Sequence, residues 1–162
     1  MRITLTPPPS PPLTGANLEA AIVTRLRHYQ QVCGLDVVRR GANTLLARTG
    51  AVSAIEIPEP YGRAIVDRLP VPGPVIVFPD PCGSRWVLLA GPGPLSSTAA
   101  GAGAALTVIR GRILPSGTEI ELPTPGAGAP WWRSRRIPTD AYRPSVAAVC
   151  EAVMAVASMG VR

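Results

Sequence analysis

Three carboxylates in the middle of the sequence are the first residues that could carry chemistry. Glu56 ends the apolar run "AVSAIEI", Glu59 follows shortly after it, and Asp80 lies in the turn-rich segment "PDPCGS". Carboxylates that converge on divalent ions are the basis of two-metal phosphoryl transfer, so these three acids are the candidate metal ligands. The position two after Glu56 is Pro58, which offers no ligand on that face of a strand. The alternative is that strand-end acids cap a helix or stay solvated, and that Asp80 forms an Asx-type turn.

The segment "PWWRSRR" at positions 130–136 is a second candidate, because two tryptophans precede three arginines. Indole faces can stack on bases and guanidinium groups can pair with phosphates, as in nucleic-acid interfaces. The structural alternative is that one tryptophan is buried against a sheet while the other covers an arginine stem. Two further arginines, in the hairpin expected beside this segment, would extend the basic surface. The candidate nucleic-acid-binding residues are therefore Arg110, Arg112, Trp131, Trp132, Arg133, Arg135 and Arg136.

Several familiar sites cannot be built from this chain. Its single histidine, His28, excludes a multi-histidine metal site, and we expect it on a helix surface rather than in a catalytic triad. The absence of lysine excludes a Walker A motif. Three widely spaced cysteines without a CxxC pair indicate reduced thiols in a cytoplasmic protein, not a zinc or disulfide framework.

The charge of the chain has two readings. All 16 basic residues are arginine, and with 10 acids the formal net charge is +6. Arginine enrichment, like that of Ala, Gly and Pro, accompanies GC-rich genomes, but a basic surface also attracts nucleic acid. The N-terminus lacks the apolar core of a signal peptide, and no apolar run approaches the length of a membrane span. We therefore expect a cytoplasmic location and no membrane partner.

The elements that would position these residues follow from periodicity and turn signals. Residues 1–15 hold five prolines and are expected to form a flexible arm, and residues 16–162 a single domain with a real core. Residues 91–105, "GPGPLSSTAAGAGAA", are expected to be a loop, as are 124–138. We expect helices over 18–33, 61–69 and 145–159, a strand over 51–57, and hairpins pairing 34–38 with 43–48, 73–78 with 85–91, and 106–111 with 118–123.

This order predicts an α+β fold. A single, mostly antiparallel sheet would be built from the hairpins, with the N- and C-terminal helices covering it.

Three quoted segments together have a familiar pattern: "AIEIPEPYGRAIVDRL", "GPVIVFPDPCGSRWVLLAGPG" and "RGRILPSGTEIELPTPG" with the following "PWWR". The first resembles a strand that ends in acids before a helix, the second a hairpin with a "TPDG"-like turn, and the third a late hairpin followed by a Pro/Gly loop. On these segments the stretch from Ile55 to Trp132 resembles the bifunctional DNA primase/polymerase N-terminal domain family, in its shortened actinomycete forms.

The resemblance implies where catalytic groups would lie. The family holds metal and nucleotide with a strand-end Asp-x-Asp pair, a hairpin histidine and a later aspartate. Here Glu56 stands at the first acid, Pro58 at the second, and Arg85 and Trp86 in the region of the histidine. No acid replaces the last aspartate in "TVIRGRIL". The resemblance therefore implies a degenerate site, with Glu56 as its relic and no catalysis.

The function expected from the sequence is that of a nucleic-acid-binding or regulatory module, with DNA or RNA as partner and no cofactor. One alternative is a protein-interaction role for the proline-rich "TPPPSPP" at residues 6–12, which can adopt a polyproline II helix. A second alternative is residual nucleotidyl transfer with Mg²⁺ or Mn²⁺ held by Glu56, Glu59 and Asp80. The oligomeric state stays open.

Overall fold

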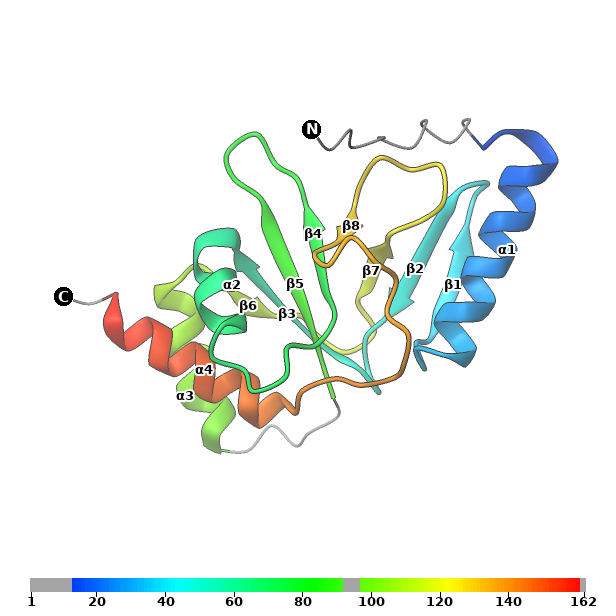
Figure 1. The fold of residues 1–162 in the computed structure, drawn as a ribbon. Helices are drawn as coiled ribbons and strands as arrows, with labels where there is room; N and C mark the ends of the chain where they lie inside the picture. Colours follow the sequence, from blue (N-terminus) through cyan, green and yellow to red (C-terminus); the bar gives the residue numbers. More distant parts are fainter. Residues whose placement is uncertain (1–12, 92–96, 161–162) are drawn as a thin grey trace, which may run out of the picture.

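A computed structural model of the protein describes residues 13–91 and 97–160, so most of the expected proline-rich arm lies outside the described residues. Figure 1 shows the fold of the described ranges, in which four helices and eight strands follow one another. The helices are α1 (Gly15–Gln31), α2 (Glu59–Val66), α3 (Ser97–Val108) and α4 (Val146–Met159). The strands are β1 (Val37–Arg40), β2 (Thr44–Arg48), β3 (Ser53–Pro58), β4 (Val75–Phe78), β5 (Arg85–Ala90), β6 (Arg112–Ile113), β7 (Glu119–Leu122) and β8 (Trp131–Trp132).

Helix α1 lies with a three-stranded antiparallel sheet in the order β1-β2-β7, in which β7 comes from much later in the chain. The expected hairpin of β1 and β2 is confirmed, with Val37 opposite Ala47. Helix α1 lies beside this sheet (Figure 1) and buries Ile22 and Tyr29, which recur at helical spacing on one face. The helix expected over 18–33 is confirmed, with its start at Gly15.

The remaining strands form a five-stranded antiparallel sheet in the order β6-β3-β5-β4-β8. The expected hairpin of β4 and β5 is confirmed. Helices α2, α3 and α4 gather on one face of this sheet, as Figure 1 shows. Successive residues of a strand point to opposite faces, so Trp86 and Leu88 pack in the helix-side core while Val87 and Leu89 pack in the core shared with the smaller sheet.

The α+β class and the antiparallel pairing are confirmed, but the strands divide between two sheets rather than one. The expected hairpin of residues 106–111 with 118–123 is wrong. Residues 106–108 belong to α3, β6 pairs with β3 in the larger sheet, and β7 pairs with β2 in the smaller sheet. The connection between β6 and β7 therefore carries the chain from one sheet to the other.

The loop expected over residues 91–105 is also wrong in its second half, which forms α3. Alanine has the highest helix propensity, and glycine is acceptable where a second helix approaches closely. A Cβ at Gly101 would lie 3.3 Å from the Sδ of Met154 on α4, so this glycine lies where α4 approaches closely. Within the described ranges, none of the helices has both the length and the apolar character that crossing a membrane requires.

Candidate functional site

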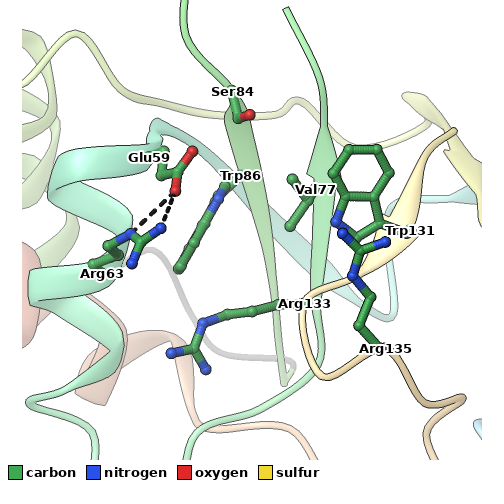
Figure 2. A pocket seen from close by; sticks show the side chains of 8 residues that line it. All are labelled: Glu59, Arg63, Val77, Ser84, Trp86, Trp131, Arg133 and Arg135. Atoms are coloured by element: carbon green, nitrogen blue, oxygen red, sulfur yellow. Dashed lines mark hydrogen bonds and ion pairs between the residues drawn. The ribbon is translucent and has the colours of Figure 1, made fainter. Parts of the chain in front are cut away.

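A row of three side chains across the larger sheet forms the floor of a pocket on its helix side. Val77 on β4 lies opposite Trp86 on β5 and opposite Trp131 on β8 in the strand register. Residues in register on neighbouring strands share a face, so two indoles flank one smaller aliphatic side chain. Figure 2 shows this row together with the rest of the lining. The pocket has a volume of about 480 Å³ and is lined by Glu59, Arg63, Val77, Ser84, Trp86, Trp131, Arg133 and Arg135.

Helix α2 closes one side of the pocket. It begins at Glu59 with Pro60 in its first turn, where the fixed φ of proline suits a helix and no amide hydrogen is needed. Arg63 follows one turn after Glu59, and its Nε donates to Glu59 Oε1 at 3.0 Å. Between them Gly62 faces the sheet, and a Cβ at this position would lie 2.8 Å from the Trp86 ring. The glycine therefore lets α2 approach Trp86 closely.

We expect Gly62→Ala to lower the free energy of unfolding, because the added methyl group overlaps Trp86. Overpacking of this kind costs about 1–3 kcal/mol, whereas alanine gains about 1 kcal/mol over glycine in a helix. Urea unfolding followed by circular dichroism measures the difference. Gly103→Ala in α3 is the matched control, since nothing lies within 4 Å of its Cβ position and it should be slightly stabilising. Equal stabilisation by both substitutions would contradict the close contact.

The pocket carries a positive charge that its own residues do not compensate. Arg63 is paired with Glu59. The guanidinium carbon of Arg133 lies 5.2 Å from the centroid of the Trp86 ring, and that of Arg135 lies 4.5 Å from the centroid of Trp131. Among the described residues, neither guanidinium has a hydrogen-bond acceptor or a carboxylate partner. With three arginines and one carboxylate, the formal charge of the lining is +2.

Two further properties of the lining affect what it can bind. The hydrogen bond from Arg63 holds the pKa of Glu59 below its usual value, so this carboxylate is ionised at neutral pH. The Trp86 side chain is 3% exposed, and its Nε1–H is buried without an acceptor in the part of the chain that the structure describes. A buried donor without a partner is rare in proteins. The pocket thus combines unused donors, positive charge and aromatic surface.

The two tryptophans of "PWWRSRR" have different environments. Trp132 is 4% exposed and points to the opposite face of the sheet, where its Nε1 donates to the hydroxyl of Tyr29 at 3.0 Å. Trp131 is partly buried at the pocket, with Arg135 over its ring. One tryptophan is therefore buried against the sheet and the other lies against an arginine, as in the structural alternative. Trp132 is not available for stacking. Arg136 is exposed and does not line the pocket.

Arg110 and Arg112 do not extend this basic surface, because β6 and β8 are at opposite edges of the larger sheet. Arg112 lies on β6, where its Nη2 donates to Glu56 Oε2 at 3.2 Å. Arg110 lies just before β6, and its backbone oxygen accepts a hydrogen bond from Arg85 at 3.5 Å. The hairpin that would have brought them next to Trp131 does not form.

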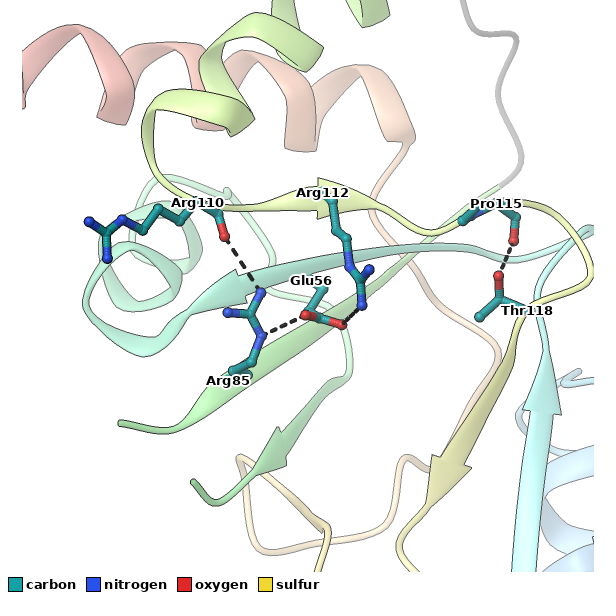
Figure 3. Close-up of polar contacts among 6 residues, drawn as sticks. All are labelled: Glu56, Arg85, Arg110, Arg112, Pro115 and Thr118. Carbon is teal, nitrogen blue, oxygen red and sulfur yellow. Dashed lines mark hydrogen bonds and ion pairs between the residues drawn. The ribbon is translucent and has the colours of Figure 1, made fainter. Parts of the chain in front are cut away.

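Glu56 is held by two arginines in a hollow between the sheets, as Figure 3 shows. Its side chain is 17% exposed, and each carboxylate oxygen has its own partner. Arg85 Nε donates to Oε1 at 2.6 Å, and Arg112 donates to Oε2. The three side chains come from β3, β5 and β6, so the pairing connects three strands. A metal ion would have to displace two guanidinium groups to reach this carboxylate.

The other two acidic candidates do not join Glu56. Glu59 lines the pocket beside α2, and Asp80 accepts a hydrogen bond from the backbone N–H of Cys82 at 2.7 Å in the β4–β5 turn. The Asx-type turn expected at Asp80 is confirmed. Over residues 13–91 and 97–160, no group of three or more His, Cys, Asp or Glu side chains is arranged to hold a metal ion.

Sequence reasoning missed Arg63 and Trp86 as site residues. Both lie more than 40 positions before "PWWRSRR", and only the pairing of β8 with β4 brings that segment to them. The one available signal was the spacing of Glu59 and Arg63, which is typical of an ion pair on a helix surface. Comparison of the chain with protein families, with characterised proteins and with solved structures finds no match.

Proposed function

We propose that this protein is a non-catalytic module that binds nucleic acid through the pocket between α2 and β8. The observation that carries the proposal is the lining: two arginines with no acceptor among the described residues beside a partly exposed indole, in a pocket of formal charge +2. Guanidinium groups bind phosphate oxygens in a planar, bidentate geometry. Aromatic and guanidinium faces stack on unpaired bases, so single-stranded DNA or RNA is the partner that this lining suits.

We further propose that the fold is a degenerate relative of the primase/polymerase domains that the sequence resembles. What supports this is the neighbourhood of Glu56, the position that corresponds to the first acid of the family. Arg85 comes from the hairpin region of the family's histidine, and Arg112 from the segment of its last aspartate, and both bond to Glu56. Cations where the family has ligands would neutralise the remaining carboxylate. A binding role without phosphoryl transfer is consistent with that replacement.

The first test is a titration of fluorescent single-stranded DNA and RNA at two salt concentrations, with wild type and Arg135→Glu. We expect the substitution to weaken binding equally across sequences and to reduce the salt slope by about one unit, as for a phosphate contact. Arg27→Glu is the matched control, because Arg27 is exposed on α1, outside the pocket, and the substitution makes the same change in net charge.

Equal loss of affinity in both variants would mean that only the net charge of the protein matters, which would contradict a specific interface. Unchanged affinity in Arg135→Glu would exclude the pocket as the interface. Because the side chain of Arg135 is exposed and lies over the Trp131 ring at the pocket, its replacement should leave the fold intact. Far-ultraviolet circular dichroism checks this for each variant.

A further inference from the structure

The arginines of the pocket come from different elements but line one cavity. Arg63 comes from α2, and Arg133 from the chain just after β8, yet their guanidinium carbons lie 6.0 and 5.2 Å from the centroid of the same Trp86 ring. Figure 2 shows both side chains on the same side of the sheet, with Trp86 between Glu59 and Val77. A groove that binds a continuous strand presents its cations along the backbone. Arginines from separate elements that line one pocket instead suit a compact anionic ligand.

The charge of the lining also distinguishes between kinds of phosphate. A phosphodiester within a strand carries one negative charge, whereas a phosphate monoester carries about −1.5 to −2 at pH 7. Three arginines and one ionised carboxylate, Glu59, give the lining a formal charge of +2. The charge of a monoester therefore matches the excess charge of the lining more closely than that of a diester does. The additional oxygen of the monoester also offers more acceptors to the guanidinium donors.

Aromatic surface lies next to this charge. Trp131 is partly buried at the opposite wall of the pocket, with the guanidinium of Arg135 over its ring. A planar base can stack on an indole or on a guanidinium plane. The volume of about 480 Å³ is within the range of small-molecule sites, which is about 300–1,000 Å³. The pocket therefore has room for a single ligand with one anionic end and one planar end.

From this arrangement we propose that the pocket binds a nucleoside monophosphate group, either free or as the phosphorylated end of a strand. Arg133, whose guanidinium has no acceptor among the described residues, would hold the phosphate monoester, with Arg63 donating to it from the N–H groups that Glu59 does not use. The base would lie against Trp131 and Arg135. This inference rests on the proposed function, because it uses the same pocket and gives it a narrower ligand.

The experiment is a calorimetric titration of the full chain with AMP, GMP, adenosine and inorganic phosphate. The same titration follows with one oligonucleotide prepared with a 5′-phosphate, with a 3′-phosphate, and with neither. We expect a monophosphate to bind at least about tenfold more tightly than adenosine, since that factor corresponds to 1.4 kcal/mol. Arg133→Ala should remove this preference, whereas Arg27→Ala should preserve it. Arg133→Gln, which keeps most of the side chain, replaces Arg133→Ala if the latter does not fold.

These titrations distinguish a free nucleotide from the end of a strand. They also distinguish failure of this inference from failure of the proposed function. Tight AMP or GMP binding supports a free nucleotide, and a preference for a phosphorylated end over the unphosphorylated strand supports a strand terminus. Equal binding of all three oligonucleotides, without competition by AMP, would overturn the inference and leave the proposed function standing. Binding of AMP alone, with no binding of any oligonucleotide, would support the inference for a free ligand and remove the strand from the proposed function. No binding of any ligand would overturn both.

Discussion

Trp132→Ala should lower the free energy of unfolding by about 3–5 kcal/mol, the usual cost of truncating a buried aromatic side chain to alanine. Trp132 lies in the core between the two sheets, edge-to-face with Tyr29 at a centroid distance of 5.9 Å. The hydroxyl of Tyr29 in turn donates to the backbone oxygen of Pro123 at 2.6 Å. The truncation therefore opens a cavity and removes the donor to a buried hydroxyl, in a protein whose total stability is expected to be about 5–15 kcal/mol.

The measurement is urea unfolding followed by circular dichroism, and the matched control is the preceding residue. Trp131→Ala should cost much less stability, because Trp131 is only partly buried, but it should weaken ligand binding at the pocket. If Trp132→Ala does not fold, Trp132→Phe keeps most of the packing and loses the hydrogen bond to Tyr29, so a smaller loss is expected. Equal losses of stability at positions 131 and 132 would contradict the assignment of one indole to the core and the other to the pocket.

Among the acids that form ion pairs in the described residues, neutralisation of Glu56 by Glu56→Gln should lower the free energy of unfolding most. The side chain keeps its volume but loses the charge that holds Arg85 and Arg112, and hydrogen bonds to charged groups contribute about 1.5–3 kcal/mol. Because Arg112 is largely exposed and can turn to solvent, we expect a loss of about 2 kcal/mol, near the lower part of that range. Thermal or urea unfolding of wild type and variant measures it.

Glu119→Gln is the control for this second prediction. Glu119 also pairs with two arginines, Arg40 and Arg48, but all three side chains are more exposed than Glu56. Solvent-exposed ion pairs contribute about 1 kcal/mol or less, so the control should change stability little. The same unfolding experiment with Mn²⁺ tests the relic interpretation of Glu56. A rise in Tm of the wild type that Glu56→Gln abolishes would mean that the carboxylate still binds metal.

Elements with a strong local pattern were predictable from the sequence. The helix expected over 145–159 is confirmed as α4, which begins at Val146, and the hydroxyl of the N-cap residue Ser145 accepts a hydrogen bond from the N–H of Ala148 at 3.1 Å. The hairpins of β1 with β2 and of β4 with β5 also match, because short turns rich in glycine, aspartate and proline bring neighbouring strands together. In each of these elements the determining interactions are within a few residues of each other.

The errors concern segments whose partners are distant in the sequence. The alanines and glycines of α3 carry little local pattern, so the sequence predicts a loop there, whereas packing against α4 makes the helix stable. Strands β6 and β7 were expected to pair with each other, yet their partners are β3 and β2, more than 50 residues earlier. Strands that are neighbours in the sequence are the first candidates for pairing. Here β6 and β7 do not pair with each other, because they belong to different sheets.

In the candidate site, too, some features follow from the local sequence and others from the packing of distant segments. The sequence by itself determined that Trp131 and Trp132 are neighbours, but the loop expected over 124–138 did not predict that they lie in β8 and so point to opposite faces. It also determined that two arginines alternate with Ser134 beyond them, and that arginine supplies all the positive side-chain charge apart from His28. Only the tertiary structure decided which face is closed by α1 and the smaller sheet, and which opens beside α2. That choice depends on how distant segments pack, since the alternation of a strand is local but the burial of each face is not.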